Sequence, residues 1–244
     1  MAEAVTAVDE ADDDARRRAI HRQAASIVAA VAPFGIVFGA GAAAAGLSML
    51  QAAGFSLFVF GGSSQFAAIE ILGDDGSIAS AAIAGLLLNV RSLAFGLIMA
   101  PALVGPLWKR AGMSQLMIDE STAVGAAQDD LRWRRYGFLV AGVGVYVVWN
   151  LTTIIGYAVF SDAQELITDL GLDAAGPAAF LALLWPRLSS PPQRRTAIAG
   201  ALIALALIPF APPGVPILAS MFGVAAAFVW PTRAAPATFD GDQS

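Results

Sequence analysis

The chain has 244 residues, of which 57% are hydrophobic and only 14% are charged, and its mean hydropathy is +0.68. A soluble domain averages about 25% charged residues, so this chain lacks the polar surface that a water-facing protein needs. It has no cysteine, and its single histidine, His21, precedes the first apolar run. These counts exclude disulfides, thiolate chemistry, zinc sites and histidine catalysis within a membrane, and we expect neither a metal nor a cofactor.

Residues 1–22 hold ten of the charged residues and predict a solvated, disordered tail. Six carboxylates come first, and a basic cluster of Arg16, Arg17, Arg18 and Arg22 follows. The acidic start and the continuation into further apolar runs argue against a cleaved signal peptide. The remaining basic residues are scattered, so the chain presents no patch for nucleic acid.

Apolar runs occupy most of the remaining chain. Most approach the roughly 20 residues that a helix needs to cross a bilayer core of about 30 Å. We therefore predict an all-α polytopic membrane protein of six to seven transmembrane segments, with a single transporter domain over 23–232 and a short tail over 233–244. The last two runs form a helical hairpin around the breaker at 211–214. The runs are 24–47, 52–72, 78–107, 137–160, 170–186, 196–211 and 214–230.

The distribution of lysine and arginine over the loops predicts the orientation. If every run crosses once, nine basic residues share one side, in 108–136, in 187–195 and at Arg233. The positive-inside rule then places the C-terminus in the cytoplasm, but the four arginines of the N-terminal tail fall on the wrong side. The conflict is repaired if an early run does not cross fully.

Two early runs are candidates for a broken or re-entrant helix. Pro33 and Gly35 interrupt the first run, and Gly61 and Gly62 interrupt the second, so we expect these four residues to act as structural hinges. Freed backbone groups are tolerated at membrane depth only where they face protein or a watery cavity. Packing of small residues between helices is the alternative interpretation of the glycines.

Arg91 lies in the middle of run 78–107, roughly 20 Å from either end at 1.5 Å per residue. An arginine cannot extend its charge that far, and a charge left in lipid is costly. Arg91 must therefore face a cavity or a partner, although a purely structural charge remains the alternative. Asn89 precedes it by two positions, so both side chains point inward only if the helix is distorted; otherwise Asn89 ties two helices together.

Further polar residues at membrane depth are candidates for substrate binding. Gln65 follows the glycines and two serines, an arrangement in which unwound backbone can hold an amino-acid carboxylate or ammonium. Trp149 and Asn150 occupy the middle of run 137–160, where a tryptophan either packs in the core or lines a pocket. The candidate substrate or translocation residues are Ser63, Ser64, Gln65, Asn89, Arg91, Trp149 and Asn150.

Three carboxylates are candidates for ion coupling. Glu70 ends its run beside Asp74 and Asp75, as a residue at the mouth of a pathway would. Asp119 and Glu120 lie in the connector 108–136, where a carboxylate pair is also typical of a solvated face or a helix N-terminus.

The ordered set of motifs resembles the AzlC-type branched-chain amino-acid permease family, named for azaleucine resistance, over roughly 25–230. The resemblance rests on several short motifs rather than one. They are Pro33-Phe34-Gly35 with Phe38-Gly39, Phe60 to Phe66, Asn89-Val90-Arg91, Asp119-Glu120, Trp149 with Thr153 and Gly156, and Gly171-Leu172-Asp173 with Phe180 to Leu184.

The resemblance implies export of branched-chain amino acids across the bacterial inner membrane by a two-component permease. This chain would be the large subunit, and a small membrane protein of the AzlD type its partner. The chain departs from the family pattern at Ser92, where a histidine is usual, at Phe95, where an aromatic hydroxyl is usual, and at Ile118, where a threonine is usual. A channel or facilitator for a small polar solute is the alternative function, and a membrane enzyme is disfavoured. The chain has no P-loop for ATP hydrolysis.

Overall fold

The computed structural model describes residues 2–162, 188–211 and 214–225, with isolated positions at 178, 181, 184 and 185. Within these ranges the chain is helical and has no strand, which confirms the all-α prediction. The chain divides into two compact units, residues 1–179 and 180–244. The predicted run 170–186 and the C-terminal tail fall largely outside the described residues.

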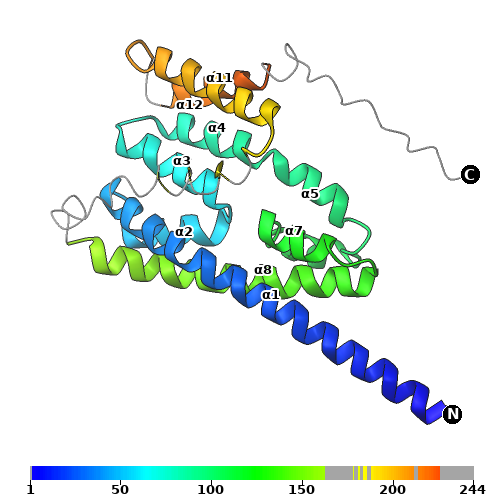
Figure 1. The fold of residues 1–244 in the computed structure, drawn as a ribbon. Helices are drawn as coiled ribbons and strands as arrows, with labels where there is room; N and C mark the ends of the chain where they lie inside the picture. The colour runs from blue at the N-terminus through cyan, green and yellow to red at the C-terminus, as the bar shows by residue number, and fades with distance from the viewer. Residues whose placement is uncertain are drawn as a thin grey trace, which may run out of the picture. The chain divides into compact units, whose positions relative to one another are not determined.

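Two long helices, α1 (Ala2–Ala44) and α8 (Leu131–Phe160), run side by side in the same direction in the first unit (Figure 1). At one end, Nε2 of His21 in α1 lies 2.8 Å from the hydroxyl of Tyr136 in α8. At the other end, the hydroxyl of Tyr157 donates to the carbonyl of Leu47, just beyond α1, at 2.8 Å. The starts of both helices therefore lie at one end of the pair.

Glycines bring the backbones of α1 and α8 into direct contact. A Cβ on Gly39 would overlap the carbonyl of Thr153, and one on Gly156 would overlap the carbonyl of Ile36. A Cβ on Gly35 would collide with the side chain of Thr152. Small residues that let helix backbones approach are the usual basis of helix association in membranes.

The structure corrects two expectations about the start of the chain. The predicted disordered tail is helical from Ala2, and Ile20 is only 2% exposed because it packs against Trp133 and Ala141 of α8. The first apolar run is not broken, since α1 continues through Pro33 and Gly35. A proline is tolerated inside a membrane helix where neighbouring groups satisfy the freed carbonyl.

The second apolar run is broken, as predicted, into α2 (Met49–Phe58) and α3 (Gly62–Gly73). The α2 helix leaves the Leu47 end of the pair and reaches the middle of α8, where the hydroxyl of Tyr146 donates to the carbonyl of Leu57 at 3.0 Å. The α3 helix then returns, and Gly73 lies against Ala45 beside the end of α1. These two half-length helices form a re-entrant hairpin.

Run 78–107 forms α4 (Ile78–Asn89) and α5 (Arg91–Met99), which are separated only by Val90, a residue that keeps helical dihedral angles. Ser77 begins α4 by accepting a hydrogen bond from the amide of Ser80 at 3.0 Å. Together α4 and α5 run opposite to α8, from the Gly73 end to Met99, which packs on Phe138 near the start of α8. The helix ends at Met99 rather than at 107, so Arg91 is closer to one end than the sequence indicates.

A second hairpin follows, made of α6 (Leu107–Ser114) and α7 (Asp119–Ala126). Just after α6, the side-chain amide of Gln115 donates to the carbonyl of Leu57 at the tip of α2 (2.9 Å). The α7 helix returns along α8, and Arg134 donates to the carbonyl of Gln128 at 3.3 Å. This hairpin therefore enters from the end at which α8 begins, opposite to the first hairpin.

The two hairpins repeat one arrangement at a spacing of 57 residues. Phe38-Gly39 in α1 recurs as Phe95-Gly96 in α5, and Ser64 in α3 recurs as Ser121 in α7. Both serines are fully buried, and each donates to the carbonyl three positions earlier, at 2.8 Å for Ser64 and 3.2 Å for Ser121. The α1–α3 contact is repeated as α5–α7. A membrane-length helical stretch, first α1 and then Ile78–Met99, is thus followed twice by a hairpin of two short helices, in opposite orientations.

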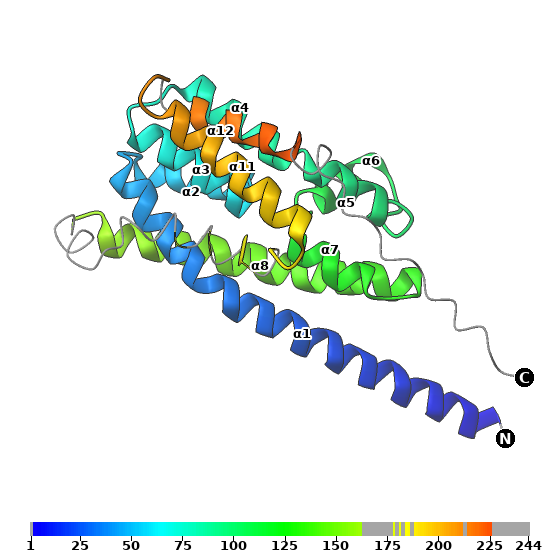
Figure 2. The same ribbon diagram turned by 45° about the horizontal axis from the view of Figure 1, so that its top comes forward.

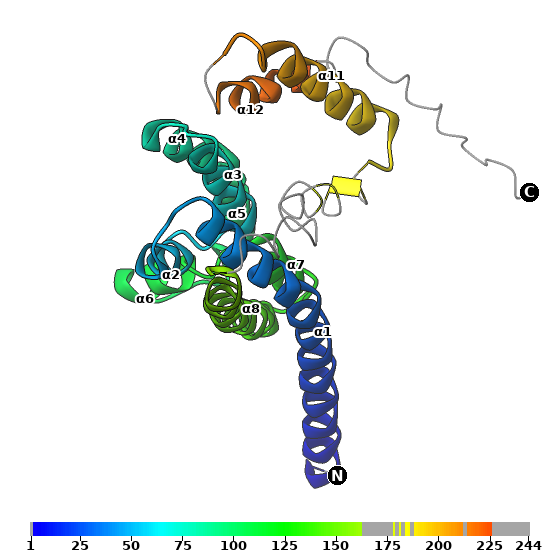
Figure 3. The ribbon, with the colours of Figure 1, turned by 90° about the vertical axis from the view of Figure 1, so that its left-hand side faces the viewer.

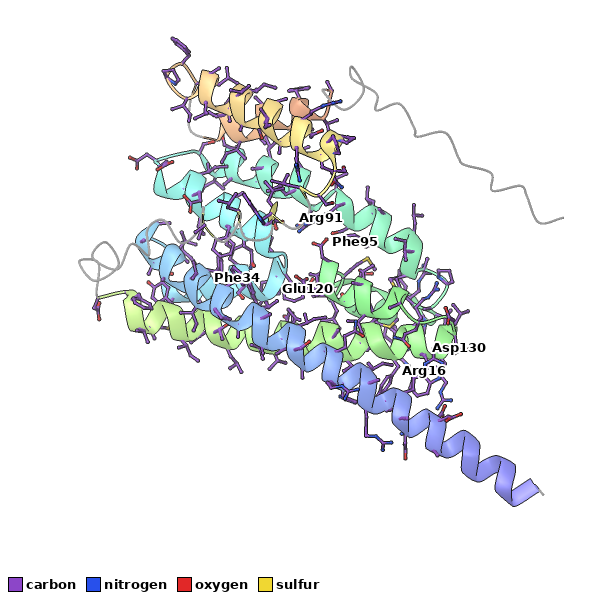
Figure 4. All side chains as sticks on the ribbon, in the orientation of Figure 1. Arg16, Phe34, Arg91, Phe95, Glu120 and Asp130 are labelled. Carbon is purple, nitrogen blue, oxygen red and sulfur yellow. The ribbon has the colours of Figure 1, made fainter. Side chains whose placement is uncertain are left out.

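The direction of the helices places the N-terminal arginines on the same side as the other basic residues, which removes the conflict found when charges were counted over the loops. Because α1 and α8 are parallel, Arg16 and Arg134 lie at the same end, and Nε of Arg16 donates to the side chain of Gln128 at 3.2 Å. Figure 4 shows Arg16 and Asp130 together at this end. The hairpin α2–α3 is the early segment that does not cross.

Three described helical stretches are long and apolar enough to cross a membrane: Ala11–Ala44, Ile78–Met99 and Leu131–Phe160. Figure 2 shows α1 and α8 extending together, with α7 along the first half of α8. Figure 3 looks nearly along α8 and shows α1, α2 and α7 around it. The chain thus builds its interior from long and half-length helices around one central helix.

The described part of the second unit is a helical hairpin, as predicted from the breaker at 211–214. It comprises α11 (Pro191–Leu207), α12 (Val215–Ser220) and the short 3₁₀ helix η3 (Met221–Val224). Gly200 and Gly223 bring the two arms into backbone contact. Gly214 has φ of +91°, a conformation that favours glycine at the start of α12.

Cysteine labelling tests the re-entrant topology, because the native chain has no cysteine. Single cysteines at Ala19 and Asp129 should resist an impermeant thiol reagent in intact cells, whereas cysteines at Ser77 and Asp162 should react. Permeabilised cells, in which all four should react, provide the control. Reaction of the Ala19 and Ser77 variants from the same side would contradict this topology.

The α1–α8 contact predicts a large difference between two glycine substitutions. Gly39→Ala places a methyl group against the Thr153 carbonyl, whereas Gly54→Ala places one where no atom lies within 4 Å. We expect Gly39→Ala to lower the free energy of unfolding by about 1–3 kcal/mol and Gly54→Ala to leave it unchanged or raise it. Thermal unfolding of both purified variants in one detergent measures the difference, and equal stability would show that the contact yields easily.

Candidate functional site

The candidate site lies where the helix breaks meet. The chain leaves helical geometry between Phe58 and Gly62, and α4 passes into α5 at Val90, which keeps helical dihedral angles. Gly61 allows the close approach of these segments, since a Cβ there would lie 2.9 Å from the hydroxyl of Ser64 and 3.0 Å from Oδ1 of Asn89. The start of α3, the end of α4 and the start of α5 therefore converge.

Arg91, the first residue of α5, joins both hairpins. Its Nη1 lies 2.8 Å from Oδ2 of Asp119 at the start of α7, and its Nη2 donates to the hydroxyl of Ser63 in α3 at 2.6 Å. The side chain of Arg91 is 38% exposed and that of Asp119 is 24% exposed. Arg91 thus has the partner that a charge at membrane depth requires, and the pair is still open to a ligand.

The fold around Asp119 holds the carboxylate in place. It occupies the first turn of α7, where a negative charge is stabilised by the helix dipole. The turn before it is fixed by Ser121, whose hydroxyl donates to the carbonyl of Leu116 at 2.6 Å. Glu120 follows on α7 and is labelled in Figure 4, with Arg91 and Phe95 on the neighbouring α5.

A cavity of about 530 Å³ adjoins this ion pair, and we call it the polar cavity because both charges of the pair line it. It lies between the ends of α2 and α6 and the first turns of α5 and α7. Its lining combines cationic, anionic, amide and hydroxyl groups with aromatic and aliphatic ones. The polar groups come from Asn89, Arg91, Ser92, Ser114, Gln115 and Asp119.

A second cavity, of about 520 Å³, lies between α2, α3 and α4 and is mostly apolar. Its lining includes Phe55, Leu72 and Leu86. Val59 and Asn89 line both cavities, so the helix break separates a polar compartment from an apolar one.

Four of the predicted substrate residues are buried behind the lining of the two cavities or contribute only to the edge of one of them. Gln65 is fully buried, donates to the carbonyl of Phe55 at 3.3 Å and lines neither cavity. Trp149 stacks on Phe38 with ring centroids 6.0 Å apart, and Asn150 donates to the carbonyl of Tyr146 at 2.8 Å. Ser64 lines the apolar cavity with its hydroxyl held by Gly61.

Several buried polar atoms near the helix breaks have no hydrogen-bond partner within the described residues. Oε1 of Gln65, Nε1 of Trp149 and Oδ1 of Asn150 are three of them. Gly62 approaches Trp149 closely, since a Cβ there would lie 3.2 Å from its ring. These residues form the packed support of the break rather than the cavity surface.

The three candidate coupling carboxylates occupy different places. Asp119 lines the polar cavity, and Glu120 follows it on α7, half-buried. Glu70 lies near the far end of α3, one turn before Asp74, and lines neither cavity. It therefore lies away from the ion pair.

Two residues that contact the helix break beside the polar cavity were not predicted from the sequence. Gln115 closes the cavity by donating to the carbonyls of Leu57 and Phe58, at 2.9 and 3.3 Å. Tyr146 supports the same break, with its ring 5.0 Å from that of Phe60. A single glutamine in a connector gives no usable signal, whereas a tyrosine in the middle of an apolar run could have been noticed.

A family model described as AzlC protein matches residues 26–161, more than half of the chain. The chain belongs to the AzlC family. This result confirms the resemblance drawn from the motifs, and the matched segment contains both hairpins and the ion pair. No curated protein and no solved structure matches the chain. AzlC proteins are membrane transporters, and the apolar helices agree with a multi-pass membrane protein.

Two of the departures from the AzlC motif pattern line the polar cavity. Ser92 and Phe95 both face it, beside Arg91. In place of two side chains that can exchange protons, the cavity has one small hydroxyl and one apolar ring. Asp119 contributes a carboxylate to the same lining.

The ion pair predicts strong coupling between Arg91 and Asp119 in stability. Arg91→Gln and Asp119→Asn each leave one charge without its partner, whereas the double variant removes both charges. We expect a coupling free energy of about 1–3 kcal/mol, between the values for exposed and buried pairs. Unfolding of the three variants and the parent gives this energy. Strict additivity of the two single effects would show that the pair contributes nothing.

Proposed function

We propose that this AzlC protein is a secondary transporter that exports branched-chain or similar neutral amino acids across the bacterial cytoplasmic membrane. We place the C-terminus in the cytoplasm and treat 23–232 as one transport domain. The observation that carries the proposal is the Arg91–Asp119 pair, 2.8 Å apart, at the edge of a polar cavity. A zwitterionic amino acid presents the two charges that complement this pair.

Substrate binding exchanges one ion pair for two. The carboxylate of the amino acid binds the guanidinium group of Arg91, whose planar geometry allows it to donate two parallel hydrogen bonds. The ammonium group of the amino acid forms an ion pair with the carboxylate of Asp119. Ser63 keeps Arg91 oriented through its 2.6 Å hydrogen bond during this exchange. The net charge of the site does not change, which limits the cost of moving the occupied site through the membrane.

The apolar cavity supplies the place for the substrate side chain. It shares Val59 and Asn89 with the polar cavity, so a ligand with its head at Arg91 can direct its side chain across the break. An aliphatic side chain gains free energy from leaving water, about 0.8 kcal/mol for each buried CH₂. Ser64, Gln65, Trp149 and Asn150 act as the supporting layer of this binding site.

A channel for a small polar solute is the second candidate function, favoured by the open polar cavity at the helix breaks. Counterflow distinguishes the two. A carrier should take up labelled leucine faster into vesicles that are preloaded with unlabelled leucine, whereas a pore should not. A small AzlD-type membrane subunit is the proposed partner, and leucine and azaleucine tolerance with and without it tests the two-component arrangement.

Arg91 variants test the proposed function directly. Arg91→Gln should abolish leucine efflux while the protein stays in the membrane, because no cation then takes the substrate carboxylate. Arg91→Lys should restore part of the activity, since a point charge does not replace a bidentate fork.

Arg110→Gln is the matched control, since Arg110 is exposed on α6 and lines neither cavity. Its efflux should equal that of the parent chain. Normal efflux from Arg91→Gln at normal membrane abundance would exclude Arg91 from the site.

A further inference from the structure

We propose that the shared end of α1 and α8 binds the headgroup of an anionic phospholipid. A separate cavity of about 210 Å³ lies there and shares no lining residue with the Arg91 cavity. Arg17 of α1 and Arg132 and Arg135 of α8 provide three guanidinium groups around it, and Trp133, Tyr136 and Leu139 complete its lining. The site is independent of the proposed transport function.

The charge available to a ligand comes from two of these arginines. Nη2 of Arg132 lies 3.1 Å from Oδ2 of Asp13, so its charge is already balanced. Arg17 and Arg135 make no side-chain hydrogen bond or ion pair to residues whose side chains the structure describes. The carboxylate of Asp130 is occupied in capping α8, where it accepts from the amides of Arg132 and Trp133 at 2.8 and 3.2 Å. Two free guanidinium groups suit one phosphodiester.

The aromatic groups place this cavity at a membrane surface. Trp133 packs against Tyr136 at 5.6 Å between ring centroids, and the guanidinium of Arg16 lies 5.4 Å from the Trp133 ring. Tryptophan and tyrosine gather at the level of lipid headgroups, and basic pockets between helix ends bind anionic headgroups. A freely diffusing phosphate would not need these rings.

The exposed face of α8 gives the acyl chains a place to lie. An apolar row continues from Leu139 in steps of four residues, which follows one inclined ridge of a helix. Its members are between 48% and 55% exposed: Val143, Val147, Leu151 and Ile155. A headgroup cavity with an apolar row leading from it fits a phospholipid and not a soluble phosphate ester.

Lipid titration of the delipidated full-length chain tests the proposal. We would follow thermal unfolding while adding short-chain phosphatidylglycerol, phosphatidylcholine with the same acyl chains, or glycerol 3-phosphate. Phosphatidylglycerol should raise the unfolding temperature saturably, and the other two should not. Arg17→Gln/Arg135→Gln should weaken the apparent affinity by about tenfold or more, because two charge-assisted contacts are lost.

Arg18→Gln/Arg22→Gln is the matched control, since it removes the same charge from the same helix end outside the cavity. Its affinity for phosphatidylglycerol should stay at the parent value. Equal losses in both double variants would overturn the proposal in favour of general surface charge. An equal response to phosphatidylcholine, or to glycerol 3-phosphate alone, would also overturn it. If the Arg17/Arg135 variant fails to fold, the three titrations of the parent chain still decide between these outcomes.

Discussion

A guanidinium group at membrane depth dictates much of the arrangement around it. Arg91 cannot remain in lipid, and its two partners come from helices that are distant in sequence, Ser63 in α3 and Asp119 in α7. Both partners sit in the first turn of a half-length helix, which requires each hairpin to reverse in the middle of the fold. The junction of α4 and α5 at Val90 places Arg91 at the same level. One charge thus accounts for the level at which the two hairpins reverse.

Two of these positions could be predicted from the sequence, because glycines and intramembrane polar residues mark them locally. Gly61 and Gly62 lie at the break between α2 and α3, and Asn89 with Arg91 flanks the junction at Val90. Pro33 carried an equally strong local signal and was wrong, since α1 continues through it. Whether a proline interrupts a membrane helix depends on the neighbours that satisfy the freed carbonyl, and a sequence does not show those neighbours.

The pairing of distant elements could not be predicted. Nothing local in α1 and α8 specifies that they are parallel, so the loop count left the N-terminal arginines on the wrong side. The 57-residue repeat also escapes notice in the sequence, because few identities carry it, among them Phe38-Gly39 with Phe95-Gly96 and Ser64 with Ser121. The two copies share hydrogen-bond geometry and burial more than residue type. For the same reason, Gln65 is a strong candidate by sequence yet lies behind the cavity wall.

The glycine contacts between α1 and α8 have a consequence for motion. Gly39 and Gly156 each press a backbone directly against a carbonyl of the other helix, so a small slide between the two helices produces collisions within one or two ångströms. The two helices therefore resist sliding along one another. The tips of the two hairpins are held instead by side-chain groups, among them Gln115 and Tyr146 on the carbonyl of Leu57 and Arg91 on Asp119, and such contacts break and re-form at lower cost than a backbone overlap. Any cycle that opens the cavity to one membrane face and then to the other must displace α2–α3 or α6–α7, with Arg91 exchanging neighbours as they move.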